Sequence, residues 1–149
     1  MTTIIDEIDF TSEEADSMGC FRVKCEIQNV TDRTKLIAMD NFLVDTGSEH
    51  TWVPADLLDQ IDVLREKKDL EFQMANGTII TRSVGFAIVR VENTFTVDEV
   101  VFAEPGDLLL LGARSLEGLN LRVDPRLKKL VAAGPLPAAA TGFALGNET

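Results

Sequence analysis

The regular alternation of apolar and polar residues is the clearest pattern along this chain. From Phe21 to Gln28, apolar side chains occupy every second position and charged or amide side chains lie between them. A period of two is typical of a β-strand with one buried face and one face in water. The run from Leu36 to Val44 predicts a second strand, antiparallel to the first across a turn at 29–33.

Similar patterns predict strands along most of the remaining chain. Residues 70–74 alternate, and apolar residues resume at 79–80 after Asn76-Gly77, the dipeptide best suited to a type I′ hairpin turn. Other strands are expected at 84–91, 95–102 and 108–111, with two short strands within 121–131. Short helices are expected at 55–61, with Pro54 at the first helical position, and at 114–119. These patterns predict a mostly β fold with two short helices.

Composition divides the chain into three parts. Residues 1–19 are acidic and give an expected N-terminal arm, while 132–149 are rich in Ala, Gly and Pro and give an expected flexible tail. The middle part, residues 20–131, is expected to fold as one domain, because 149 residues is an ordinary single-domain length.

Charge and hydropathy exclude several classes of partner. The chain has 25 acidic and 14 basic residues, a net charge of -11, and no stripe of Lys and Arg that would bind phosphates. The longest wholly apolar run, 108–111, is too short to cross a bilayer, and the start does not resemble a signal peptide. We expect a cytoplasmic protein with no nucleic-acid or membrane partner. Cys20 and Cys25 would point to opposite faces of one strand, so we expect neither a disulfide nor a shared metal.

Three segments, in order, resemble the aspartic peptidases of the pepsin and retropepsin kind. FLVDTGSEHTWVP, residues 42–54, is similar to their active-site loop, and Leu110-Leu111-Gly112 is similar to the element that closes this loop. The hairpin at 73–78 falls between them, where the family has its flap. The resemblance covers about 21–131 and is closest to bacterial single-domain members. It implies a retropepsin-like acid protease fold, a closed β-barrel with two short helices and one lobe per chain.

The chemistry gives the motif around Asp45 a specific requirement. Hydrolysis of a peptide without metal or covalent intermediate needs a base to deprotonate water and an acid to protonate the substrate. Two carboxylates about 3 Å apart meet this need, because they share one proton. The chain has a single Asp-Thr-Gly and no room for a second lobe of the same size. The second carboxylate is therefore expected from another copy, in a homodimer with a two-fold axis.

The neighbours of Asp45 are expected to position it. Gly47 permits close approach of its amide to the carboxylate, and the Ser48 hydroxyl can donate to the outer carboxylate oxygen. By resemblance, Thr46 would bond across the dimer axis.

The resemblance also assigns residues outside the loop. Substrate would lie under a flap, and an apolar element would support the loop. The flap residues are Met74, Ala75, Asn76, Gly77 and Thr78, and the supporting residues are Leu110, Leu111 and Gly112.

The leading functional hypothesis is thus an aspartic endopeptidase that acts on extended peptides, with no cofactor and no metal. The alternative is a catalytically inactive dimeric module of the same fold that binds peptides or acts as a scaffold. Two departures from the family motivate it: Ala113 stands where retropepsins have an arginine, and the chain has no tyrosine for the flap. For that reason Trp52 is expected to be a packing residue. His50 is expected to be an exposed loop residue without a role.

Overall fold

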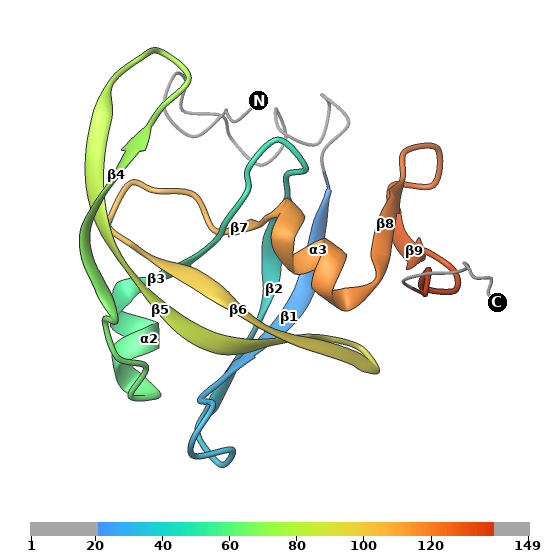
Figure 1. Ribbon diagram of the computed structural model, residues 1–149, viewed down its shortest axis with the longest axis horizontal. Coiled ribbons are helices and arrows are strands. Elements are labelled where there is room, and N and C mark those ends of the chain that lie inside the picture. Colours follow the sequence, from blue (N-terminus) through green and yellow to red (C-terminus); the bar gives the residue numbers. More distant parts are fainter. Residues whose placement is uncertain (1–20, 139–149) are drawn as a thin grey trace, which may run out of the picture.

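The computed structural model describes residues 21–138, which form a β-rich fold with nine strands and two short helices (Figure 1). The strands are β1 (Arg22–Gln28), β2 (Leu36–Val44), β3 (Thr51–Pro54), β4 (Lys67–Gln73), β5 (Ile79–Val91), β6 (Thr94–Ala103), β7 (Leu110–Leu111), β8 (Leu121–Asp124) and β9 (Lys129–Ala132). The helices are α2 (Ala55–Gln60) and α3 (Ala113–Leu119). The prediction of a mostly β fold with two short helices is confirmed.

Seven of these strands form one sheet that closes on itself. Their order is β1-β2-β7-β3-β6-β5-β4, and β1 also pairs with β5, so six strands make a ring while β4 lies outside it beside β5. β1 and β2 pair antiparallel, as expected. Within the ring each strand has a partner on both sides, whereas among the described strands β4 pairs only with β5 and keeps one free edge. In Figure 1, β4 and β5 extend together as a long hairpin on one side of the ring.

Buried apolar side chains form two clusters. The larger one includes Leu58 of α2 and Leu116 and Leu119 of α3, so both helices are packed against the strands through it. The smaller one is built around Trp52 and Leu110 and a few neighbouring side chains, and apolar residues of β4 pack against it. The base of the long hairpin therefore shares a core with the strands that flank the Asp45 motif.

Three strand predictions need correction. Residues Thr51–Pro54 were expected within a loop but form β3, which pairs parallel to β6 and has its first three residues buried, so it shows no alternation. The expected strands at 79–80 and 84–91 are one strand, β5. Gly85 does not break β5, because its missing Cβ lets the Leu64 carbonyl oxygen approach to 2.2 Å from the position a Cβ would take. β7 is only Leu110–Leu111, shorter than expected.

The hairpin at 73–78 is present, but its turn type is not the one predicted. The Met74 amide donates to the Thr78 carbonyl at 2.8 Å and the Gly77 amide donates to the Met74 carbonyl at 2.9 Å, which encloses a three-residue loop. Gly77 has φ 89°, whereas Asn76 is not among the described residues with positive φ. A type I′ turn needs positive φ at both, so that prediction is wrong; a turn followed by a glycine bulge fits three-residue hairpins.

The helix boundaries and the final hairpin agree closely with expectation. Pro54 is the N-cap of α2 rather than its first helical residue, and α3 begins at Ala113, one residue earlier than expected. The last two strands, β8 and β9, form a separate two-stranded sheet around a turn at 125–128. This small sheet follows α3 directly in the chain.

The terminal predictions lie largely outside the described residues. These are the arm at 1–19, Cys20, and residues 139–149 of the expected tail. Cys25 is a free buried thiol, and burial raises its pKa to about 12. Among residues 21–138 no helix has the length and apolar character needed to cross a membrane.

Candidate active site

Asp45 follows the last residue of β2 and starts a tight turn. β2 pairs parallel to β7, with Val44 opposite Leu111, and the Asp45 amide donates to the Leu111 carbonyl at 3.1 Å. The Ser48 amide donates back to the Asp45 carbonyl, also at 3.1 Å. Because its backbone is bonded on both sides, the direction in which Asp45 leaves the strand is determined by the sheet.

The carboxyl group of Asp45 is buried and only half satisfied. The residue is 7% exposed, and Oδ1 accepts the Gly47 amide at 2.9 Å, as the sequence predicted. Oδ2 is buried without a hydrogen-bond partner in the described chain. Burial raises the pKa of this carboxyl, and the Gly47 amide opposes the shift because it favours the ionised form. A buried carboxyl that is poised to keep a proton is the group that acid–base chemistry requires.

The two other loop residues are placed differently. Ser48 is 5% exposed, and its hydroxyl donates to the His50 carbonyl at 3.1 Å. The expected bond from this hydroxyl to the outer oxygen of Asp45 is therefore absent from the described chain, because the loop turns the hydroxyl toward its own backbone. Thr46 is exposed.

The Leu110-Leu111-Gly112 element lies directly against the Asp45 loop. Leu110 and Leu111 are fully buried. A Cβ on Gly112 would lie 2.3 Å from the His50 carbonyl oxygen, so only glycine permits this contact. The next residue, Ala113, donates its amide to the Ser48 carbonyl at 2.8 Å. Backbone hydrogen bonds thus hold together two segments that are more than sixty residues apart.

A buried hydroxyl chain that the sequence did not predict reinforces this contact. Thr51 Oγ1 accepts the Gly112 amide at 3.0 Å and lies 2.7 Å from Ser115 Oγ, which donates to Asp98 Oδ2 at 2.9 Å. Thr51 and Ser115 are both fully buried. No spacing rule links these residues, since they come from β3, α3 and β6.

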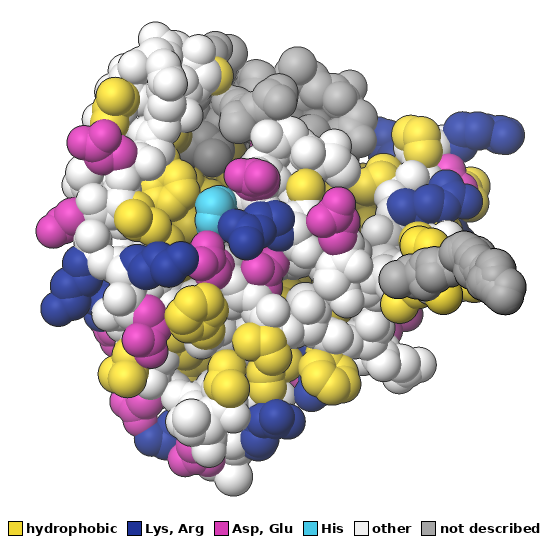
Figure 2. All heavy atoms as spheres, in the orientation of Figure 1, with side chains coloured by type: hydrophobic (Ala, Val, Ile, Leu, Met, Phe, Trp, Pro, Cys, Tyr) yellow, Lys and Arg dark blue, Asp and Glu magenta, His cyan; other side chains and the backbone are white. Residues whose placement is uncertain are grey.

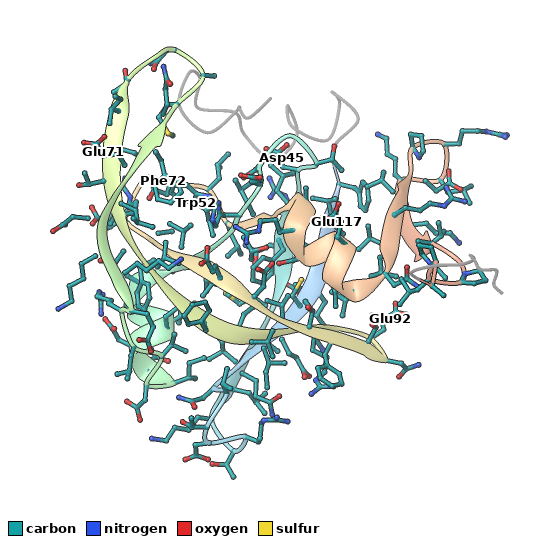
Figure 3. The ribbon with its side chains drawn as sticks, in the orientation of Figure 1. Asp45, Trp52, Glu71, Phe72, Glu92 and Glu117 are labelled. Carbon is teal, nitrogen blue, oxygen red and sulfur yellow. The ribbon has the colours of Figure 1, made fainter. Side chains whose placement is uncertain are left out.

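The expected flap residues form the exposed end of the β4–β5 hairpin. Met74 is half-buried, while Ala75, Asn76, Gly77 and Thr78 are exposed. Below them, Phe72 of β4 meets Trp52 of β3 in an edge-to-face contact with ring centroids 5.3 Å apart. Figure 3 labels these two residues next to one another, between the hairpin and the Asp45 loop. Trp52 is 3% exposed, so its prediction as a packing residue is confirmed.

His50 differs from its prediction as an exposed residue. Its side chain is 17% exposed, its Nε2 lies 3.3 Å from Glu99 Oε1, and its ring packs edge-on against Phe72. Glu99 also accepts bonds from Lys67, and it pairs with Arg114 at 3.5 Å. These cations, Lys67 first, lower the pKa of Glu99. Sequence could not reveal this cluster because Glu99 lies on a distant strand.

The residues that the structure describes do not form a set of metal ligands. Within residues 21–138, no three His, Cys, Asp or Glu side chains are grouped closely enough to hold a metal ion. The hydrogen bonds of Asp45 in this part of the chain are made with backbone amide and carbonyl groups.

Comparison with known proteins agrees with the geometry of the loop. Residues 39–118 match the model of the family described as "gag-polyprotein putative aspartyl protease". The match begins in β2, includes the Asp45 loop and the hairpin, and ends in α3. No curated protein matches the chain. Since the model spans more than half of the sequence and includes Asp45 and the Leu-Leu-Gly element that braces it, the chain belongs to this retropepsin-like aspartic protease family.

Proposed function

We propose that the protein is an aspartic endopeptidase in which two chains each contribute one Asp45. The observation that carries this proposal is the state of the Asp45 carboxyl: Oδ1 accepts the Gly47 amide, while the buried Oδ2 has no partner in the described chain. An unpartnered buried carboxylate oxygen is costly, and a second carboxyl that shares a proton with it would remove that cost. Exposed Thr46, beside it, would lie at the axis between the two chains.

The reaction follows from a dyad that holds one proton. The ionised Asp45 takes a proton from water as the water oxygen attacks the peptide carbonyl carbon, while the protonated Asp45 gives its proton to the carbonyl oxygen. The tetrahedral intermediate then collapses: the C–N bond breaks, the leaving nitrogen receives the proton of the dyad, and a hydroxyl of the intermediate returns one proton to the dyad as the new carboxyl group forms. The raised pKa of Asp45 favours a protonated member of the pair.

The rest of the lobe would hold the substrate. In this proposal residues 20–131 form the protease lobe as a closed barrel, with the arm at 1–19 and the tail at 132–149 outside it. The hairpin tip, Met74 to Thr78, would cover an extended peptide and offer it backbone groups, since the tip carries small and polar side chains.

A mixing experiment tests both the activity and the dimer. Asp45→Asn should lower cleavage of an unstructured peptide by about 10²- to 10⁴-fold, because the dyad loses its acid–base pair. The matched control is Asp40→Asn, an exposed aspartate on the same strand. An equal mixture of parent and Asp45→Asn chains, allowed to exchange, should retain about one quarter of the activity of the same total amount of parent, because only parent–parent dimers act.

The outcomes separate the possibilities. Retention of about one half would mean that each chain acts alone. Full activity in Asp45→Asn would end the assignment.

The second candidate, an inactive peptide-binding module, is favoured by the same unpartnered oxygen if the chain stays a monomer. A single chain offers Oδ2 no second carboxyl in the described residues. Sedimentation that shows monomers, together with recovery of an intact bound peptide over a wide pH range, would support this candidate over the protease.

A further inference from the structure

His50 lies where the Asp45 loop, α3 and β4 come together, and β4 is the strand that leads into the flap (called the flap strand below). Its backbone carbonyl accepts the Ser48 hydroxyl at 3.1 Å and rests against Gly112, at 2.3 Å from the position of a Cβ. The backbone of His50 is therefore part of the braced loop, five residues after Asp45. In Figure 2, the cyan side chain is His50, the one histidine of the sequence, and basic, acidic and hydrophobic side chains surround it.

The ring of His50 reaches the flap strand. It packs edge-on against Phe72, with centroids 5.5 Å apart and planes at 87°, and Phe72 in turn packs against Trp52. Phe72 lies two residues before Met74, where the flap loop begins. An edge-to-face contact of this kind is favourable and directional, so it favours one position of the strand over others.

The polar edge of His50 faces a second set of contacts. Its Nε2 is 3.3 Å from Glu99 Oε1 and 3.3 Å from Arg114 Nη1. Glu99, with a side chain 14% exposed, also accepts a bond from Lys67, the first residue of β4. The polar cluster of His50, Lys67, Glu99 and Arg114 thus joins the loop to both the start of β4 and the first turn of α3.

We propose that His50 is a positioning residue that couples the flap to the loop of Asp45. The closed flap then lies at one fixed distance from the Asp45 carboxyls. The inference rests on the proposed protease function. The ring of His50 acts on the strand that carries the flap through Phe72, and its backbone carbonyl anchors the residue to the turn of Asp45 through Ser48. Loss of its side chain would uncouple the two segments while leaving the buried clusters of the fold in place.

Hydrogen exchange of the peptide-free protein tests the coupling without relying on activity. In His50→Ala, exchange of the flap amides of Met74 and Gly77 should rise by about three- to tenfold, because the ring contact with Phe72 is lost. The loop amides of Gly47 and Ser48 should keep the parent rates, because the variant keeps the His50 carbonyl that accepts the Ser48 hydroxyl. Core amides of β5 and β6 should keep the parent rates. The control is Glu49→Ala, an exposed neighbour on the same loop, which should leave all four amides unchanged.

Two further variants separate the two sides of the ring. His50→Phe keeps an aromatic edge for Phe72 and should restore the flap amides. His50→Gln keeps polar atoms for Glu99 and Arg114 but no ring, so its flap amides should exchange as in His50→Ala. Equal flap protection in His50→Ala and the parent would overturn the proposal, as would a rise shared by the core amides, which would indicate only lost stability.

Peptide cleavage adds a second readout. If the proposal holds, His50→Ala should raise KM by about three- to tenfold with a smaller change in kcat, and His50→Phe should recover KM. A fall in kcat alone, with parent KM, would contradict a role through the flap. If the parent cleaves nothing, the proposed function fails while the exchange result still decides the coupling.

Discussion

The turns that contain Gly47 and Gly77 both follow a β-strand, yet the structure holds them in different ways. The first is bonded to β7 and α3 through the amides of Asp45 and Ala113, and its core side consists of fully buried Leu110 and Leu111. The second is closed by two bonds between residues of its own hairpin, and its tip is exposed. The carboxyl is therefore held by long-range packing, while the flap is held locally.

This difference is what the proposed chemistry needs. A catalytic carboxyl must keep its position to a fraction of an ångström, which buried backbone bonds provide. A cover over the substrate must open and close, which is easier for a segment with few buried contacts. The contact between His50 and Phe72 lies at the base of the flap, where the locally held hairpin meets the loop that long-range contacts hold.

The largest expected difference between the two regions is in how much the side chains packed beneath each turn contribute to the free energy of unfolding. Leu111→Ala removes a fully buried side chain beneath the Asp45 loop and should lower the free energy of unfolding by about 2–5 kcal/mol. Ile79→Ala, at the start of β5 beside the flap and 57% exposed, should change it by less than about 0.5 kcal/mol. Urea denaturation of both variants measures this, and similar losses would show that the flap is as deeply anchored as the loop.

Two glycine substitutions compare how much space the backbone leaves beside the Asp45 loop and at the flap turn. Gly112→Ala places a Cβ against the His50 carbonyl and should cost about 1–3 kcal/mol and disturb the Asp45 turn. At Gly77 a Cβ would meet nothing within 4 Å, so Gly77→Ala should cost only the strain of φ 89°, about 1 kcal/mol. Chemical shifts of the Asp45 turn should move in the first variant and stay in place in the second. The opposite pattern would refute the comparison.

The smallest expected effect is the pH dependence of stability that Asp45 contributes. Burial raises the pKa of Asp45 in the folded chain, so folding takes up a proton at pH values between the unfolded and the folded pKa. Stability should therefore fall as pH rises through that window, and the penalty is complete above the folded pKa. Asp45→Asn, measured at dilutions where the chains are monomers, should lack this fall. A steeper fall in Asp45→Asn than in the parent would contradict a raised pKa.

The elements that the sequence predicted well have a strong local signal. β1 and β2 follow the alternation of apolar residues, and β2 has the predicted boundaries. The flap hairpin was predicted from the Asn76-Gly77 dipeptide between two apolar runs, although Gly77 adopts a bulge rather than the second position of a type I′ turn. β3 was missed because a short strand covered on both faces has no alternation to detect.

In the candidate site, too, contacts with a local sequence signal were mostly predicted and contacts with distant residues were not. The sequence by itself determined that Asp45 follows a strand and that Gly47 lets its amide reach the carboxyl, because these depend on neighbours along the chain. The packing of Trp52 was predicted on another ground, the absence of a tyrosine to which it could bond in the flap.

Only the structure showed that the Ser48 hydroxyl bonds to the His50 carbonyl two residues away and not to Asp45, because the loop conformation decides between the two acceptors. That His50 meets Glu99 was likewise decided by the tertiary structure, since this contact is set by the pairing of distant strands. The unpartnered oxygen of Asp45 likewise reflects three-dimensional packing, which encloses the carboxyl without giving it a second donor from residues 21–138.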